Sequence, residues 1–244
     1  MSDAGDPNEV AVLVPAAGEG SRLGGPRKQF RTLGGRPLLV QVLQVFERHP
    51  AVGHLVVAVP EPHVQEVTDR LQDEGFSSLS AVVSGGGSRQ ESVHHALRAA
   101  PAPVEIVLVH DAVRPFVQAG QVERVIEASR THGAASLAMP VADTLRKASG
   151  EVFGDTVPRE GLYRMQTPQG FRRAWLEEAH RVAVQADDAP ATDDVGLVQR
   201  IGRDVHLVRG DRRNFKITTT GDWQLAQQLW AGWANDPDRF AVAE

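Results

Sequence analysis

The feature that most constrains this chain is a repeated order: a short apolar run, a glycine-rich or polar turn, and then a helix-like segment. The apolar runs occupy residues 10–14, 54–59, 79–83 and 104–109. The first run is continuous rather than alternating, which is typical of a strand buried on both faces, as in a parallel sheet. Strands alternating with helices at this spacing predict an α/β fold with a mostly parallel sheet.

The segments between and after these runs have helical patterns. Ser88 followed by Glu91 matches a capping box at the start of one helix, and Asp222 is the expected cap of the last one. The helices are predicted over 37–46, 61–74, 89–100, 118–131, 172–186, 192–202 and from Asp222 onward. Further strands are predicted over 134–139, 205–209 and 214–218.

The composition excludes several classes of protein. The 244 residues include 26 Lys and Arg and 31 Asp and Glu, which gives a formal net charge of −5. This charge argues against a general electrostatic grip on nucleic acid or on an anionic membrane, so we expect neither as a partner. The chain has no cysteine, which excludes disulfides and a thiol nucleophile and fits a reducing, cytoplasmic location.

The organisation of the chain is expected to be simple, with one interruption. Residues 1–9 are polar and acidic and lack the apolar core of a signal peptide, so we expect a short disordered leader. One domain is expected over 10–236. The α/β pattern breaks at about 141–170, a polar stretch too long for an ordinary connection. We predict an extended β arm that packs against a second subunit; a local surface excursion is the alternative.

The loop after the first apolar run combines glycines with cations. Its glycines miss the spacing of a dinucleotide fingerprint by one residue, and no Gly-Lys-Ser/Thr follows to complete a P-loop. Small residues let backbone N–H groups approach a phosphate closely. Arg22, Arg27 and Lys28 add positive charge beside them. The loop therefore favours a triphosphate ligand over a dinucleotide.

Two later loops have related features. Gly85–Gly87 follow the third apolar run, and Asp111 and Arg114 follow the fourth. Ligands of open α/β sheets bind outside the carboxyl ends of the strands, so the three loops can converge on one cleft. Arg114 supplies a donor fork suited to phosphate or carboxylate. His94 and His95 lack the spacing of a zinc pair, so we predict that they bind no metal, and we name no other metal-ligating side chain.

Seven short motifs then occur in the order found in one enzyme family. They are Pro15-Ala16-Ala17-Gly18-x-Gly20-x-Arg22, Lys28-Gln29-Phe30, Gly86-x-x-Arg89-x-x-Ser92-Val93, His110-Asp111-Ala112-x-Arg114-Pro115, Asp143-Thr144, Thr167-Pro168-Gln169 and Lys216-Ile217-Thr218. Over about residues 10–230, the chain resembles the 2-C-methyl-D-erythritol 4-phosphate cytidylyltransferase family of the non-mevalonate isoprenoid route. Each motif alone is weak, but seven in order are a specific signal.

The resemblance implies a Rossmann-like nucleotidyltransferase domain with a protruding β arm that completes a homodimer. It also implies a reaction in which the phosphate of 2-C-methyl-D-erythritol 4-phosphate attacks the α-phosphorus of CTP. The products are pyrophosphate and 4-diphosphocytidyl-2-C-methyl-D-erythritol. A phosphate monoester is largely a dianion at neutral pH, so the step needs positioning and relief of negative charge rather than a general base.

The same resemblance implies roles for individual residues. Arg22 and Lys28 are expected to stabilise the pentacovalent phosphorus, and Arg159 and Lys216 to place the acceptor, with Arg159 acting from the partner's arm. Mg²⁺ is expected as a cofactor held mainly by the CTP phosphates. The expected CTP contacts are Ala16, Ala17, Gly18, Glu19, Gly20, Gly86, Ser92, Asp111 and Ala112. The expected acceptor contacts are Asp111, Arg114, Thr144, Arg159, Thr167 and Lys216.

Two alternatives and two departures from the family pattern stay open at this point. Ribitol-5-phosphate cytidylyltransferases share most of the motifs, although their first loop usually reads Gly-Gly-Thr-Gly. A non-catalytic nucleotide-binding regulator is the alternative from a different class. Arg27 stands where the family usually has proline, and Gly87 stands where it often has an acid.

Overall fold

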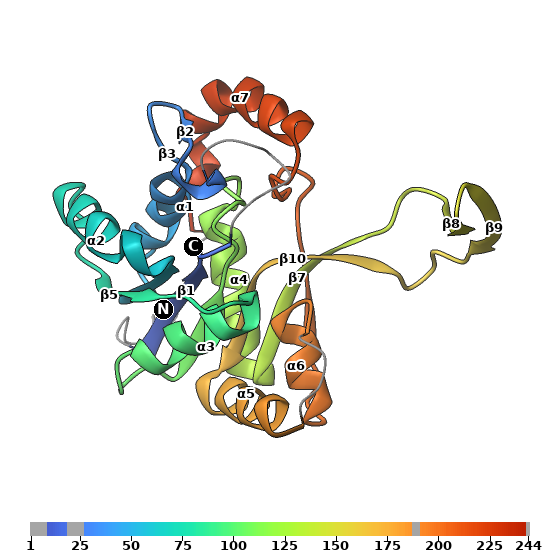
Figure 1. Ribbon diagram of the computed structural model, residues 1–244, viewed down its shortest axis with the longest axis horizontal. Coiled ribbons are helices and arrows are strands. Elements are labelled where there is room, and N and C mark those ends of the chain that lie inside the picture. Colours follow the sequence, from blue (N-terminus) through green and yellow to red (C-terminus); the bar gives the residue numbers. More distant parts are fainter. Residues whose placement is uncertain (1–8, 19–26, 187–190, 243–244) are drawn as a thin grey trace.

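Seven strands form the central β-sheet, in the order β11-β7-β10-β6-β1-β4-β5 (Figure 1). The computed structural model describes residues 9–18, 27–186 and 191–242. Neighbouring strands are parallel except for β10, which is antiparallel to both β6 and β7. The predicted mostly parallel α/β sheet is therefore confirmed. The strands are β1 (Val10–Pro15), β4 (His54–Val59), β5 (Leu79–Ser84), β6 (Ile106–Val109), β7 (Ala134–Pro140), β10 (Tyr163–Arg172) and β11 (His206–Arg209).

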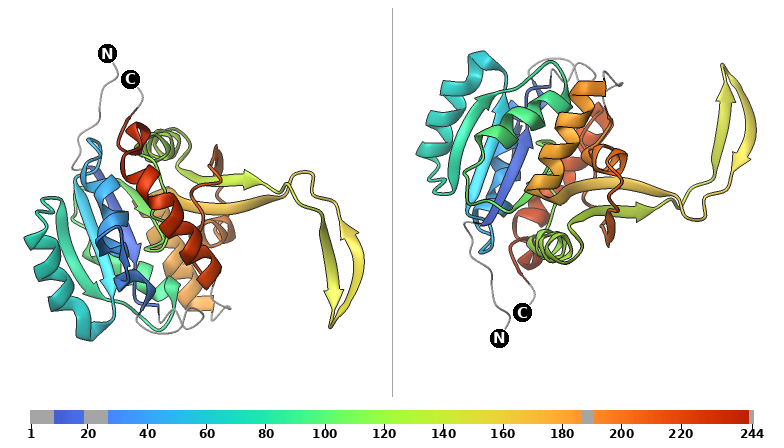
Figure 2. Two further views of the ribbon diagram at one scale, coloured as in Figure 1. Left: turned by 90° about the horizontal axis from the view of Figure 1, so that it is seen from above. Right: turned by 90° about the horizontal axis from the view of Figure 1, so that it is seen from below.

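Helices cover both faces of this sheet (Figure 2). Their predicted positions agree with the structure to within a few residues, except that the segment predicted over 61–74 divides into a 3-10 turn and a helix. The α-helices are α1 (Leu38–Glu47), α2 (Val64–Asp73), α3 (Arg89–Ala99), α4 (Ala119–His132), α5 (Arg173–Ala186), α6 (Asp194–Arg200) and α7 (Thr220–Ala234). The 3-10 turns are η3 (Lys28–Phe30), η4 (Glu61–His63) and η5 (Pro237–Arg239).

The central strand β1 explains why the apolar runs are continuous. Val12 belongs to a buried cluster with residues of α1, α2 and α4, whereas Leu13 belongs to a second cluster with residues of α3, α5 and α6. Successive strand residues point to opposite faces of a sheet. Because helices cover both faces, every position of β1 except Pro15 is buried, and no polar residue interrupts the run.

Three local predictions are wrong. Residues 214–218 form no strand, because Ile217 is buried against α7 and makes one backbone bond, from its N–H to the carbonyl of Val113. Thr219, not Asp222, is the N-cap of α7, and Asp222 is the third residue of its capping box. Ser88 caps α3 as expected, but Glu91 accepts a hydrogen bond from the N–H of Gly87 at 2.7 Å.

A two-stranded hairpin projects from the end of β7 and β10 (Figures 1 and 2). It consists of β8 (Leu145–Ser149) and β9 (Val152–Val157), which pair antiparallel. The pairing of β7 with β10 begins at Pro140 and Tyr163, so residues 163–170 lie in the sheet and the arm is shorter than the expected 141–170. Near its tip, Phe153 is 77% exposed. The arm therefore exposes an apolar surface that none of the described residues covers.

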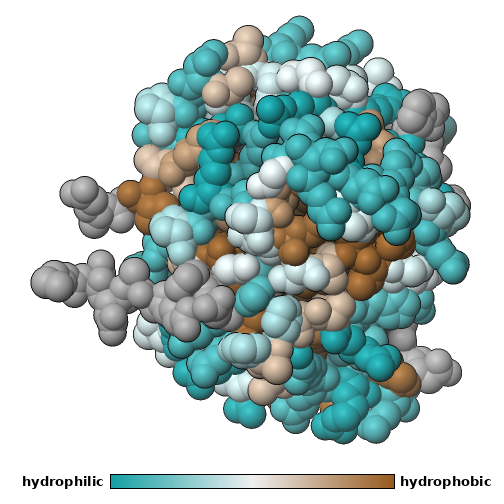
Figure 3. Space-filling view, turned by 90° about the vertical axis from the view of Figure 1, so that its left-hand side faces the viewer, coloured by the Kyte–Doolittle hydropathy of each residue, from teal (hydrophilic) through white to brown (hydrophobic). Residues whose placement is uncertain are grey.

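No helix in the described part of the chain is both long and apolar enough to cross a bilayer. On the face turned away from the arm, hydrophilic residues surround a band of hydrophobic ones (Figure 3). A second small hairpin is formed by β2 (Thr32–Leu33) and β3 (Arg36–Pro37). Of the predicted leader, residues 1–8 lie outside the described residues.

Candidate active site

A cleft of about 560 Å³ lies at the carboxyl ends of β1, β5 and β6, where the three glycine-rich or polar loops meet. The convergence expected from the order of strands and loops is therefore found. The cleft is lined by Pro15, Ala16, Ala17, Gly18, Arg27, Lys28, Gln29, Pro60, Gly85, Gly86, Gly87, Ser88, Arg89, Ser92, Asp111, Ala112, Val113 and Lys216.

The loop after β1 is held through its carbonyl groups. Gln29 donates to the carbonyl of Ala16 at 2.6 Å and to that of Gly18 at 3.3 Å, and Arg27 donates to the carbonyl of Ala17 at 3.0 Å. A carbonyl and the N–H of the next residue lie in one peptide plane and point in opposite directions within it. The side chains of Arg27 and Gln29 therefore fix the orientation of consecutive peptide groups along the loop.

The loop after β5 is equally constrained. A Cβ atom on Gly85 would lie 2.3 Å from the Cβ of Ala17, so only glycine lets the two loops approach this closely. The Ser92 hydroxyl accepts from the N–H of Gly86 at 3.2 Å and donates to the carbonyl of Ser88 at 2.9 Å. Ser92 thereby holds the turn that leads into α3.

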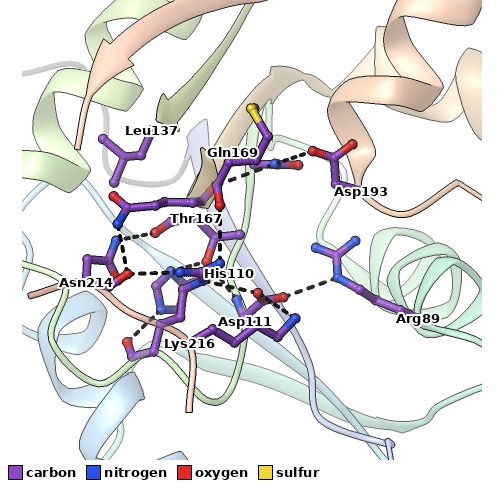
Figure 4. A network of polar contacts seen from close by, with 12 residues as sticks. Arg89, His110, Asp111, Leu137, Thr167, Gln169, Asp193, Asn214 and Lys216 are labelled. Carbon is purple, nitrogen blue, oxygen red and sulfur yellow. Dashed lines mark hydrogen bonds and ion pairs between the residues drawn. The ribbon is translucent and has the colours of Figure 1, made fainter. Parts of the chain in front are cut away.

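Asp111, after β6, is the centre of a charged cluster at the floor of the cleft (Figure 4). One carboxylate oxygen pairs with Lys216 Nζ at 3.1 Å and Arg114 Nε at 3.2 Å, and the other with Arg89 Nε at 3.2 Å. Burial raises the pKa of this carboxyl, but the charges of Arg89, Lys216 and Arg114 outweigh it and hold the pKa well below its usual range. Asp111 is therefore ionised and holds three cations in place.

Buried polar residues beneath the cleft support Asp111 (Figure 4). The Thr167 hydroxyl, from β10, accepts the N–H of Asp111 at 3.1 Å and lies 3.2 Å from His110 Nδ1. His110 Nε2 donates to the carbonyl of Arg114 at 3.1 Å. Burial lowers the pKa of His110 to about 4, so its ring is neutral, with the proton on Nε2.

Arg89 connects this cluster to α6. Its Nη1 donates to Asp194 Oδ2 at 2.7 Å, while its Nε bonds Asp111. Asp194 is fully buried, and its N–H donates to Gln169 Oε1 at 3.1 Å. Burial lowers the pKa of Arg89, but the attraction of Asp194 and Asp111 together outweighs it and raises the pKa above its usual value. Arg89 is thereby fixed in the cleft with its charge intact.

The chain matches the family model described as IspD, 2-C-methyl-D-erythritol 4-phosphate cytidylyltransferase, over residues 10–231. The chain belongs to this family. A 2-C-methyl-D-erythritol 4-phosphate cytidylyltransferase of Salinibacter ruber is 66% identical over 234 residues, which are 96% of this chain and 98% of that protein. The corresponding protein of Deinococcus radiodurans is 44% identical over 220 residues, which are 90% and 89% of the two chains.

Solved structures agree with this assignment. The crystal structure of 2-C-methyl-D-erythritol 4-phosphate cytidylyltransferase from Thermus thermophilus is 41% identical, covers 91% of this chain and 99% of its own, and superposes with a TM-score of 0.76. The protein is therefore an enzyme, a cytidylyltransferase of isoprenoid biosynthesis acting on 2-C-methyl-D-erythritol 4-phosphate. The family match decides against the ribitol-phosphate and regulator alternatives.

Within this cytidylyltransferase fold, the cleft gathers most of the predicted nucleotide-site residues. Arg22, Glu19 and Gly20 lie outside the described residues. The predicted residues that line the cleft are Ala16, Ala17, Gly18, Lys28, Gly86, Ser92, Asp111, Ala112 and Lys216.

The other predicted acceptor contacts lie elsewhere in the cytidylyltransferase chain. Arg114 and Thr167 are buried behind Asp111 and bond it, rather than lining the cleft. Thr144 and Arg159 are exposed at the base of the arm, where the guanidinium of Arg159 donates to the carbonyl of Ala142. In a single chain, the structure does not bring these two residues to the cleft.

Sequence reasoning assigned no role to several residues that organise the site. Arg89 and Gln29 stand inside the family motifs, so their place in those motifs was the available signal. Asp194 carried no such signal, because it lies 105 residues from Arg89 in the chain and resembled an ordinary helix-start residue. Asn214, whose side-chain amide donates to the carbonyl of Thr167 at 2.8 Å, was likewise missed.

Proposed function

We propose that the cleft binds CTP and that the loops after β1, β5 and β6 carry out cytidylyl transfer in it. One observation carries this proposal: the predicted CTP contacts at 16–18, 86, 92, 111 and 112 line one cleft together with Lys28 and Lys216. Ala16–Gly18 and Gly86 would contact the nucleotide through backbone groups, because small residues allow close approach.

The charge of the cleft supports a polyanionic substrate. Its described lining contains four cations, Arg27, Lys28, Arg89 and Lys216, and one carboxylate, Asp111. In phosphoryl transfer, catalysis comes mainly from positioning and from preorganised charge around the phosphorus. We assign Lys28, with Arg22 of the same loop, to stabilising the negative charge that develops at the α-phosphorus. Lys216, fixed by Asp111, would position the acceptor phosphate for in-line attack.

We propose Mg²⁺ as the cofactor, bound through the phosphate oxygens of CTP. The described residues include no group of three His, Asp or Glu side chains able to hold a metal. Asp111 is the one acidic residue in the described cleft lining, and both of its oxygens are already paired with cations. A cleft lined in this way fits a metal ion that binds together with the nucleotide, on its phosphate oxygens. Bound there, Mg²⁺ would neutralise phosphate charge.

We propose that the active site is shared between two subunits of a homodimer. Thr144 and Arg159 lie on the arm, outside the cleft of their own chain, and the arm exposes Val152 and Phe153 at its tip. Large apolar side chains exposed together are typical of protein–protein contact surfaces. In the dimer, the partner's arm would bring the partner's Arg159 to the acceptor side of the cleft. We expect the enzyme to act in the cytoplasm, in keeping with its lack of cysteine.

The decisive experiment measures pyrophosphate release with CTP and Mg²⁺, comparing 2-C-methyl-D-erythritol 4-phosphate with ribitol 5-phosphate. We expect fast release with the first acceptor and background release with the second. Omitting Mg²⁺ should abolish release. Equal rates with both acceptors would contradict the proposed acceptor site, and undiminished rates without a divalent cation would contradict the proposed cofactor.

A further inference from the structure

Arg27 is a cation in the cleft to which the proposed function assigns no role of its own. It lies immediately before η3, next to Lys28, and lines the cleft. Its Nη1 donates to the carbonyl of Ala17 at 3.0 Å. A guanidinium has five N–H donors, so this bond uses one of them. Within the described residues, the guanidinium of Arg27 makes no other hydrogen bond.

Arg27 also differs from Arg89 and Lys216 in how its charge is paired within the described residues. Arg89 pairs with Asp111 and Asp194, and Lys216 pairs with Asp111. No carboxylate in the described part of the chain lies within ion-pair distance of Arg27. A cation in a concave site that has no carboxylate partner among the described residues is available to an anionic ligand.

The bond to Ala17 does not by itself require an arginine. Gln29 bonds the carbonyls on either side of Ala17 with a neutral amide, so a neutral donor suffices to orient this loop. A planar guanidinium differs from an amide in its permanent charge and in its ability to bind two phosphate oxygens at once. The chemistry that only arginine adds at this position is therefore phosphate binding.

We propose that Arg27 is a further phosphate-binding residue of this enzyme, holding the β- and γ-phosphates of CTP while its Nη1 bonds the loop at Ala17. This inference rests on the proposed binding of CTP in the cleft. Arg27 would thereby link the bound phosphates to the carbonyl of Ala17. It would also bind the pyrophosphate product, because the same two phosphates leave together.

The test is direct binding without acceptor, so that no turnover occurs. Calorimetric titration of CTP, CMP and inorganic pyrophosphate, each with Mg²⁺, is compared for wild type, Arg27→Gln and Arg27→Lys. Gln can still donate to the Ala17 carbonyl but has no charge, whereas Lys keeps the charge. Because Arg27→Gln removes a charge-assisted hydrogen bond, it should weaken the binding of CTP and of pyrophosphate by about tenfold or more. CMP affinity should change by about threefold or less, and Arg27→Lys should recover part of the loss.

Arg36→Gln is the matched control, because Arg36 lies in the same segment of the chain and pairs with Glu74 outside the cleft. It removes the same charge and should leave CTP affinity unchanged. Equal weakening of CTP and CMP by Arg27→Gln, no weakening at all, or an equal effect of Arg36→Gln would overturn the role of Arg27. Failure of the wild-type enzyme to bind CTP would instead overturn the proposed function.

Discussion

The guanidinium of Arg89 lies between two buried carboxylates, with its Nε 3.2 Å from Asp111 Oδ1 and its Nη1 2.7 Å from Asp194 Oδ2. Asp111 follows β6 and Asp194 begins α6, so one side chain of α3 joins two distant parts of the fold. Because Asp111 also pairs with Lys216, the position of a proposed catalytic lysine depends on an ion-pair network that continues beneath the cleft.

Asp111→Asn should impair both folding and catalysis. Removing one partner of a buried ion pair leaves cations uncompensated, which costs about 3–5 kcal/mol when the groups are fully buried. Lys216 is partly exposed, so we expect a smaller loss of unfolding free energy, about 2 kcal/mol. Chemical denaturation measures the stability, and kcat/KM for the acceptor should fall by about 100-fold or more.

The loss of unfolding free energy caused by Asp111→Asn should depend on pH, because the pKa of Asp111 is lowered in the folded protein. A carboxyl whose folded pKa lies below its unfolded value near 3.8 contributes stability above that value and loses it as pH falls further. The stability difference between wild type and Asp111→Asn should therefore be constant from about pH 5 to 8 and shrink below about pH 4. A difference that already shrinks between pH 7 and pH 5 would contradict an ionised, charge-stabilised Asp111.

Lys28→Ala should lower kcat by about 1,000-fold with little change in stability. The amine is expected to act on charge that develops at the phosphorus, and removal of one such stabilising group typically costs about 10²–10³ in rate or more. Steady-state pyrophosphate release gives kcat, and circular dichroism melting checks the fold. A kcat within about tenfold of wild type would contradict this role.

A shared active site predicts complementation between two inactive variants. Lys28→Ala and Arg159→Ala should each be inactive as homodimers. In a mixed dimer, one of the two sites has both residues intact, so about half of the wild-type activity per dimer should return. Differently tagged subunits, coexpressed and purified through both tags, supply the mixed dimer. If such dimers show no recovery, Arg159 acts within its own chain.

His110 should remain neutral well below the pH at which an ordinary histidine protonates. Burial lowers its pKa from 6.5 to about 4. As pH falls, His110 takes up a proton in the unfolded chain before it does so in the folded one. Its contribution to the free energy of unfolding is therefore complete above about pH 6.5 and is lost as pH drops from there toward 4. A pKa shift of this size in one group lowers the free energy of unfolding by about 3 kcal/mol over that pH range. Two-dimensional NMR of the histidine rings should show that His110 does not titrate between about pH 8 and 5; an ordinary titration near 6.5 would contradict its burial as a neutral ring.

Gly133→Ala should destabilise the fold without changing the chemistry. Gly133 ends α4 with φ of 86°, and an added Cβ would lie 2.2 Å from the ring of Trp175. Backbone strain and this clash together should cost about 2–3 kcal/mol. Gly232→Ala is the control, because it lies within α7 with no atom near its Cβ and should stabilise the helix by about 0.5–1 kcal/mol. Thermal melts of both variants test the contrast.

The local parts of this protein could be predicted from the sequence because they depend on neighbouring residues. The apolar run at 10–14 became β1, Ser88 became the cap of α3, and the glycines at 85–87 became the turn beside Ala17. The rule that loops at the carboxyl ends of parallel strands meet at one edge then placed Asp111 and Lys28 in the same cleft.

Contacts between distant segments were decided only by the tertiary structure. Nothing near Asp194 in the chain indicates that it pairs with Arg89, because burial and the packing of α6 against α5 create that pair. Residues 214–218 have the composition of a strand, yet burial of Ile217 beneath α7 leaves them as a loop that carries Lys216 to Asp111. Local propensity is a weak preference that burial overrides. The sequence by itself therefore determined which loops form the site, and only the packing of distant elements decided which charges are paired within it.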